Sequence, residues 1–181
     1  MRIFISGGCK NGKSMTAQRI AKAMSGGGTL YYVATMLSRD AEDDERIERH
    51  RRERDGWGFT TVEQPTDIGE LAEKCDTGAV FLLDSLTALL ANEMFRDGDV
   101  NMDAADKIIA GTDRLLDAVP HIVIVSDYIY SDAVRYDPLT ELYRKSLARI
   151  DRAVAARCDT VIEIAFSASV VHKGGIGGLR L

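Results

Sequence analysis

The chain has 181 residues, 45% of them hydrophobic and 28% charged, which is the composition of a soluble globular protein with one sizeable core. Its net charge of −5 argues against a nucleic-acid partner, and it has neither an apolar stretch long enough to span a bilayer nor a signal-peptide pattern. Its three scattered cysteines form no C-x-x-C pair, which favours a reducing cytoplasm over a disulfide framework or a zinc site.

A phosphate-binding motif follows the first predicted strand, which spans residues 3–5. The motif has the pattern G-x-x-x-x-G-K-[ST], in which glycines let backbone N–H groups turn toward phosphate oxygens. Lys13 supplies a positive charge for the outer phosphates, and Ser14 is a candidate Mg²⁺ ligand. A helix that begins near Ser14 directs its positive end at the same anion. We therefore expect ATP or GTP to bind to this loop, whose residues are Gly7, Gly8, Cys9, Lys10, Asn11, Gly12, Lys13 and Ser14.

The elements after the loop alternate between helix and strand. Apolar residues from Ala17 to Met24 recur at helical spacing, and three consecutive glycines end this helix. Residues 30–34 predict a second strand, with Thr35 at its carboxyl end. The next segment, residues 40–55, is almost entirely charged and favours a third element, a helix that buries little.

The charged helix has two interpretations. It is either a solvated surface helix with ion pairs between residues four apart, or part of a site. The second interpretation starts from Arg46, Arg49 and His50, which fall on one helical face at the spacing i, i+3, i+4. That face would be a cationic patch with one imidazole capable of nucleophilic attack.

A second candidate for the triphosphate site lies further along the chain. Residues 79–83 form a continuous apolar run, which is typical of a central parallel strand, and the run ends in Asp84. An acidic residue at the end of such a strand, downstream of a phosphate loop, is the position that holds Mg²⁺ through water. The alternative interpretation is that Asp84 caps the helix that follows.

The remaining pattern completes an alternating α/β chain. At the carboxyl end of the strand at residues 122–125, Asp127 and Tyr128 are site candidates by position, because ligands bind at that edge of open α/β sheets. We predict an α/β P-loop NTPase fold, a three-layer sandwich around a mostly parallel sheet. One catalytic domain would span residues 1–173, with a flexible Gly-rich tail at 174–181. The other predicted elements are strands at 59–62 and 160–165, the latter being the last strand, and helices at 68–75, 86–94, 104–119 and 139–157.

The loop alone predicts nucleotide binding and leaves the reaction open. A P-loop protein of this size typically transfers the γ-phosphoryl group to a small molecule, with Lys13 and Mg²⁺ neutralising the developing charge. His50 suggests a different step, in which the imidazole attacks the α-phosphate and expels pyrophosphate. A nucleotide-binding module without turnover is the third alternative.

The chain resembles the bifunctional adenosylcobinamide kinase and adenosylcobinamide-phosphate guanylyltransferase family of cobalamin assembly. Apart from the loop, no single piece is specific, but the pieces occur in the family's order over roughly residues 1–126. The Arg46-Ile-Glu-Arg-His50 piece is the most telling, because the family histidine that becomes guanylylated falls on His50. The matching segments are 5–14, 32–35, 46–50, 61–65, 83–92 and 125–126.

The resemblance implies a RecA-like fold, a homotrimer and two reactions at one site. A nucleoside triphosphate phosphorylates adenosylcobinamide, and GTP then guanylylates His50, from which GMP passes to adenosylcobinamide phosphate. The partners are therefore a corrinoid and GTP or ATP, with Mg²⁺ held by Ser14 and Asp84. Besides the loop, the nucleotide-binding residues that the resemblance implies are Thr35, Arg46, Arg49, Glu63 and Asp84.

The later half departs from the family. Where relatives carry Asn-Glu before a turn, this chain has Asp127 and Tyr128, and Asp151 stands for an Asn of the following helix. These changes fall at the strand edge where substrate or nucleotide is expected. The departure removes a Glu that is a candidate base, and Asp127 is the nearest carboxylate that can replace it.

Overall fold

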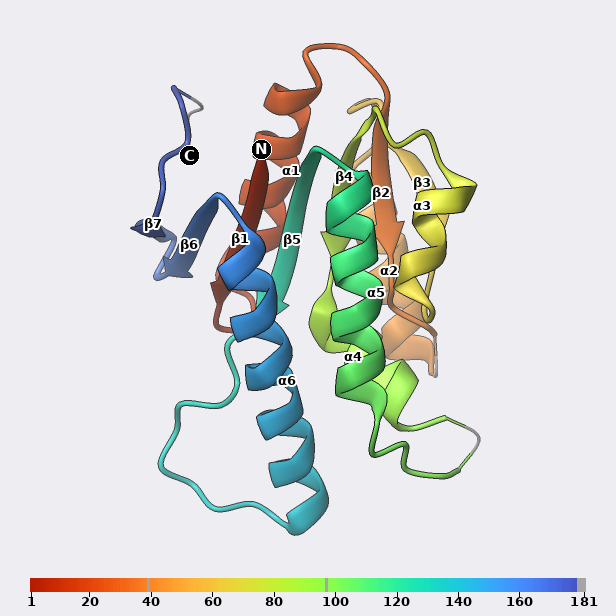
Figure 1. Cartoon of the computed structure of the whole chain (residues 1–181), viewed down its shortest axis with the longest axis vertical. Coiled ribbons are helices and arrows are strands. Elements are labelled where there is room, and N and C mark those ends of the chain that lie inside the picture. The colour runs from red at the N-terminus through yellow and green to blue at the C-terminus, as the bar shows by residue number, and fades with distance from the viewer. Residues whose placement is uncertain (39, 97, 179–181) are drawn as a thin grey trace.

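One sheet of seven strands organises the part of the chain that the computed structural model describes, residues 1–38, 40–96 and 98–178. Its strand order is β3-β2-β4-β5-β1-β6-β7, and every pair is parallel except the antiparallel pair β6 and β7 (Figure 1). The strands are β1 (Arg2–Gly7), β2 (Leu30–Ala34), β3 (Thr60–Glu63), β4 (Val80–Asp84), β5 (His121–Asp127), β6 (Thr160–Ala165) and β7 (Ala168–Lys173).

Helices cover both faces of the sheet and complete the three layers. The predicted helices are all present, although the one predicted at 68–75 is a 3₁₀ turn (Ile68–Glu70) followed by a single short α-helix. No described helix is both long and apolar enough to cross a membrane. The helices are α1 (Lys13–Ser25), α2 (Ala41–Glu53), α3 (Leu71–Lys74), α4 (Leu86–Met94), α5 (Ala104–Ala118) and α6 (Pro138–Arg157).

The core consists of two clusters, one on each face of the sheet. Successive strand residues point to opposite faces, so Phe4 joins one cluster while Ile3 and Ile5 join the other. Helix α1 covers the cluster of Ile3 and Ile5, and α3 to α6 cover the cluster of Phe4. Burial on both faces explains why the central strands read as continuous apolar runs.

The prediction that residues 160–165 form the last strand is wrong, because β7 follows and pairs with β6. Most side chains of β7 are exposed, so its sequence lacks the apolar alternation that marks a half-buried strand. The connecting turn, Phe166–Ser167, also lacks the Asn-Gly or Gly-X pair that usually marks a tight hairpin.

Residues 174–178 of the Gly-rich tail make contacts with the domain. The Thr160 hydroxyl donates a hydrogen bond of 2.8 Å to the Gly175 carbonyl, and Ile176 packs against the core on the α1 face. Gly174 has φ +70° and lies so close to the Asp159 carbonyl that a Cβ would fall 2.0 Å from its oxygen. Residues 179–181 lie outside the described part of the chain, and the division into a domain and a flexible tail stays a prediction.

The sheet order sets the position of the site. β5 lies between β1 and β4, and Gly7 is in register with Asp127 while Asp84 is in register with Val125. The phosphate loop, Asp127 and Asp84 therefore share the carboxyl edge of the sheet, where ligands bind in open α/β folds.

Candidate active site

The phosphate loop joins β1 to α1 in a conformation that needs its glycines. Gly12, the N-cap of α1, has φ +92°, and Lys10 is also left-handed at φ +55°. A Cβ on Gly7 would fall 2.2 Å from the Ile164 carbonyl oxygen, so only glycine fits between β1 and β6. The Asn11 amide donates a hydrogen bond to that same carbonyl. The loop is thus fixed against the edge of β6.

Lys13 lies inside this loop rather than on its surface. Lys13 is only 6% exposed, and its ammonium donates a hydrogen bond of 2.7 Å to the Gly8 carbonyl. The same nitrogen lies 2.8 Å from Oδ1 of Asp127. The cation is therefore held at the end of β1 by one backbone and one carboxylate oxygen, where phosphate oxygens would compete for it.

Asp84 does not cap the following helix, so the capping interpretation is wrong. Ser85 is the N-cap of α4, and its hydroxyl accepts 3.4 Å from the Ala88 amide. The Asp84 carboxylate instead accepts 3.0 Å from the Tyr32 hydroxyl. Asp84 is half-buried at the end of β4, which leaves its other oxygen available to a ligand at the sheet edge.

Thr35 is buried between the ends of β2 and β4. Its hydroxyl donates 2.8 Å to the Ser85 carbonyl and accepts 2.7 Å from the Ser85 amide. Its carbonyl accepts 2.7 Å from the Asn92 side chain. These bonds give Thr35 a structural task at the site edge, and its nucleotide-binding role stays a prediction.

His50 lies on the inner side of α2. Ile47 and His50 are half-buried and Arg54 is 7% exposed, whereas Arg49 is exposed. The side chain of Arg46 lies outside the described part of the structure, so the predicted cationic face of Arg46, Arg49 and His50 stays a prediction. The structure does show that His50 belongs to the face that turns toward the sheet.

Arg54 anchors the end of α2, a role that the sequence pattern did not reveal. Its guanidinium lies 3.6 Å from the centroid of the Tyr32 ring, and the Tyr32 hydroxyl reaches Asp84. Arg51 pairs with Glu63 at 3.1 Å, which uses the exposed Glu63 carboxylate for a salt bridge. Periodicity carries no signal for these contacts, because the segment is charged at almost every position.

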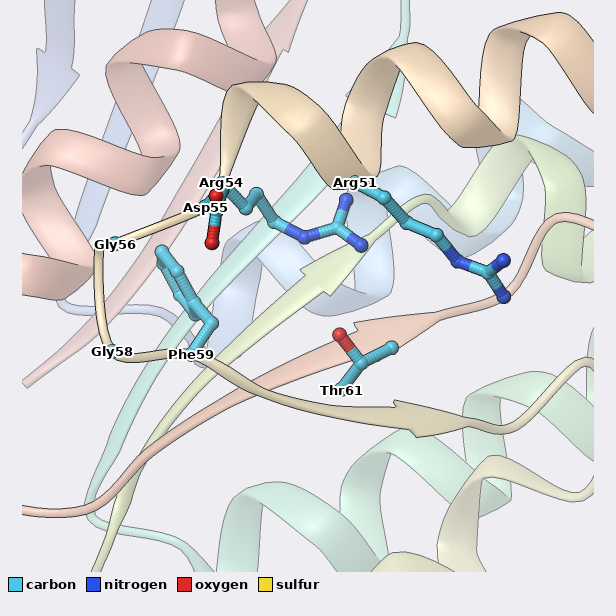
Figure 2. Close-up of a pocket in the computed structure, with 7 residues that line it drawn as sticks. All are labelled: Arg51, Arg54, Asp55, Gly56, Gly58, Phe59 and Thr61. Carbon is cyan, nitrogen blue, oxygen red and sulfur yellow. The ribbon is translucent and has the colours of Figure 1, made fainter.

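The end of α2 and the start of β3 line an open pocket of about 500 Å³. Figure 2 shows Arg51 and Arg54 extending from the helix toward the strand that carries Thr61. Two cationic side chains beside a hydroxyl group suit an anionic group. The lining residues are Arg51, Arg54, Asp55, Gly56, Gly58, Phe59 and Thr61.

A buried acid lies behind Asp127. Asp151 of α6 is 2% exposed and accepts 3.0 Å from the Tyr130 hydroxyl. Burial raises the pKa of Asp151 to about 7; the Tyr130 hydrogen bond offsets the rise in part, and the nearby Asp127 charge adds to it. The sequence marks Asp151 only as a departure from the family Asn, because burial of one helical position depends on tertiary packing.

The fold and the loop together define a P-loop NTPase with a RecA-like three-layer sandwich. Solved structures of similar fold agree with this class. Their sequence identities to this chain are low, so the similarity is one of fold. Flagellar accessory protein FlaH from Methanocaldococcus jannaschii has a TM-score of 0.54 and 17% identity, over 97% of this chain and 79% of that one. A KaiC-like protein from Pyrococcus horikoshii OT3 has a TM-score of 0.54 and 12% identity, over 96% of this chain and 78% of that one.

The family follows from sequence. The family model described as cobinamide kinase / cobinamide phosphate guanyltransferase matches residues 3–170, so the chain belongs to that family. A similar protein is the bifunctional adenosylcobalamin biosynthesis protein CobP of Pseudomonas aeruginosa. It is 29% identical over 163 residues, which are 89% of this chain and 91% of the relative.

Proposed function

We propose that this protein catalyses two consecutive steps of cobalamin nucleotide-loop assembly. The first transfers a phosphoryl group from a nucleoside triphosphate to the hydroxyl of adenosylcobinamide. The second transfers GMP from GTP to adenosylcobinamide phosphate and releases pyrophosphate. The observation that carries the proposal is the family match over residues 3–170, with Lys13 buried in a formed phosphate loop.

Lys13 and Asp127 would perform the kinase step. Lys13 would move from the Asp127 carboxylate to the β- and γ-phosphates and neutralise the charge that develops there. The alcohol oxygen of the corrinoid attacks the γ-phosphorus, and the bond between that phosphorus and the β–γ bridging oxygen breaks. Asp127 is the carboxylate at the loop that can accept the proton of the alcohol.

Ser14 and Asp84 fit a Mg²⁺ ion that is shared with the triphosphate. Both supply hard oxygen, and both lie at the carboxyl edge of the sheet. The described residues include no group of three or more His, Cys, Asp or Glu side chains that could enclose a metal. That suits Mg²⁺, which takes one or two carboxylates and completes its shell with phosphate and water. The bound ion would supply charge neutralisation at the phosphates.

His50 would carry the guanylyl group in the second step. An imidazole nitrogen attacks the α-phosphorus of GTP, the bond to the α–β bridging oxygen breaks, and pyrophosphate leaves. A phosphate oxygen of adenosylcobinamide phosphate then attacks the same phosphorus, the P–N bond breaks, and free His50 is restored. The half-buried position of His50 on the sheet side of α2 supports this role.

The other predicted contacts and the assembly belong to the same proposal. Thr35, Arg46, Arg49 and Glu63 would line the nucleotide site, as the family resemblance implies. We also propose a homotrimer, which the family resemblance supports. We place it in the cytoplasm, which the scattered free cysteines support.

A labelling experiment tests the second step. Protein incubated with GTP labelled at the α-phosphate should acquire acid-labile label, whereas GTP labelled at the γ-phosphate should transfer its label to adenosylcobinamide. His50→Ala should abolish the protein-bound label. His172→Ala is the matched control, because His172 pairs with Glu163 on the exposed β7. Label that persists in His50→Ala would exclude His50 as the carrier.

A kinase without the guanylyl step is the second candidate function. The Asp127-Tyr128 departure favours it, because it alters the strand end that borders the loop. This candidate predicts γ-phosphoryl transfer to adenosylcobinamide that survives His50→Ala, with no α-label on the wild-type protein.

A further inference from the structure

The turn between β6 and β7 holds an exposed aromatic ring in a strained backbone. Phe166 and Ser167 have φ +52° and +61°, the left-handed region at both positions of a two-residue turn. That conformation favours Asn-Gly, and a bulky aromatic residue rarely adopts it. Phe166 as a whole is 102% exposed, so its ring buries no surface that would offset the strain. Strain of this kind concentrates at functional sites.

This turn lies beside the phosphate loop. β6 pairs in parallel with β1, and Ile164 is in register with Gly7, the first residue of the loop. Phe166 follows Ile164 by two residues and comes directly after the end of β6, so it lies beyond the carboxyl edge of the sheet on the loop side. Asn11 ties the loop to the Ile164 carbonyl, which makes the hairpin a wall of the site.

The two sides of the loop have different tasks. On the β5 side, Asp127 contacts Lys13 and the Tyr128 amide donates 2.9 Å to the Gly7 carbonyl. Asp84 lies beyond β5 on the same side. If Lys13, Asp127 and Asp84 serve the γ-phosphate, as in the proposed function, the ribose and base of a bound nucleotide would leave the loop toward β6, where the hairpin turn lies.

We propose that the ring of Phe166 stacks on the purine base of the nucleotide that the loop binds. This inference rests on the proposed function and names the base-binding part of that site. Stacking uses the face that every base offers, so one ring accepts adenine and guanine alike. A single site with such a platform can use ATP or GTP for phosphoryl transfer. The strained turn has a purpose in this arrangement, because it presents the ring to the ligand rather than to the core.

Tyr128 is the competing aromatic residue, and its position argues against it. It is 43% exposed, but its ring packs edge-on against Tyr130 with centroids 4.8 Å apart. It also follows Asp127 directly, on the side of the loop that faces the γ-phosphate. Tyr128 would therefore lie beside the phosphoryl acceptor, and Phe166 is the aromatic residue on the side where we expect the base.

Equilibrium binding of two probes tests the proposal. Dissociation constants for GTP and for inorganic tripolyphosphate would be measured by calorimetry on the full chain. Phe166→Ala should weaken GTP binding by roughly 5- to 150-fold, the range that stacking on one aromatic ring contributes, and should leave tripolyphosphate binding unchanged. Val170→Ala is the matched control, because Val170 is 49% exposed on the same hairpin, and it should bind both probes as the wild type does.

Phe166→Asn distinguishes the effect of the ring on GTP affinity from its effect on stability. Asn tolerates the left-handed region, so this variant should unfold at a higher temperature than the wild type while it loses the same affinity for GTP. Phe166→Tyr, which keeps an aromatic ring, should bind GTP as tightly as the wild type does. Wild-type affinity for GTP in Phe166→Ala, or an equal loss for tripolyphosphate, would overturn the stacking role while leaving the proposed function standing. A wild-type protein that binds neither probe would overturn both.

Discussion

α1 and α2 have the same length but are attached to the domain by different kinds of contact. Each has 13 residues, and each carries a residue assigned to phosphorus chemistry, Lys13 on α1 and His50 on α2. α1 buries Ala17, Ile20 and Ala21 completely in the core. The polar α2 is attached by side-chain contacts such as Arg51 with Glu63 and Arg54 with Tyr32.

The difference separates a fixed site from a movable one. A helix with a buried apolar face opens only with the domain, whereas a helix held by polar contacts opens at a low free-energy cost. The phosphate loop is therefore a constant part of the fold. His50, the proposed nucleophile, lies on the helix that is held by polar contacts and opens at the lower cost.

The largest expected effect is on the fixed side. Lys13→Ala should lower both γ-phosphoryl transfer and His50 labelling by roughly 10²- to 10³-fold, because both steps need the triphosphate held. Thermal unfolding should confirm that the variant is folded. Wild-type rates for either step would refute a shared triphosphate site.

Asp151→Asn, in the buried face of α6, should change the free energy of unfolding by an amount that depends on pH. Below about pH 3 the side chain is protonated in folded and unfolded chains, so the variant and the wild type should match. As pH rises to about 7, the unfolded wild type releases a proton that the folded state retains, and its free energy of unfolding falls relative to the variant. Above pH 7 the variant should be more stable by up to about 4 kcal/mol.

Urea unfolding between about pH 3 and pH 8.5 measures this difference. Asp99→Asn is the control for the change from carboxylate to amide, because Asp99 is exposed in a loop. A constant difference between Asp151→Asn and the wild type at every pH would contradict the raised pKa.

Arg54→Ala should loosen the movable side. Loss of the buried contact with Tyr32 is expected to destabilise the α2 attachment by about 2 kcal/mol. Amide exchange in residues 41–53 should accelerate and His50 labelling should slow, while γ-phosphoryl transfer changes less. Arg52→Ala, an exposed position on the same helix, should show neither effect. Equal losses in both reactions would mean that α2 serves the two steps alike.

The smallest expected effects are those of Asp84 and Ser85, two neighbouring residues at the end of β4. Ser85→Ala removes the N-cap of α4 and should cost about 1 kcal/mol of stability with little change in rate. Asp84→Asn should do the reverse, with normal unfolding and a higher Mg²⁺ requirement in the kinase assay. A normal Mg²⁺ titration for Asp84→Asn would remove Asp84 from the metal site.

The sequence predicted the parts whose signals are local. Apolar runs marked β1, β4 and β5, and the glycine pattern marked the loop. β7 escaped notice because its strand is exposed and its turn uses Phe166 and Ser167 in place of glycine. Tertiary packing decided the rest, since no local pattern says that β5 inserts between β1 and β4.

Position at a strand end predicted where two carboxylates lie, whereas charge did not distinguish one residue of the 40–55 segment from another. Asp127 and Asp84 were candidates because they end buried strands, and the structure places both at the loop edge. Arg54 was indistinguishable from its charged neighbours, although it alone among the described arginines of that segment is buried. Its contact depends on Tyr32, which comes from a different strand.

The contact between Lys13 and Asp127 has a consequence for selectivity among anions. The carboxylate is an internal competitor for the lysine, so a ligand displaces it only when its own charge is large. A triphosphate meets that requirement better than a single phosphate ion does. We expect the pair to act as a threshold that keeps free phosphate out of the loop and speeds the release of spent products.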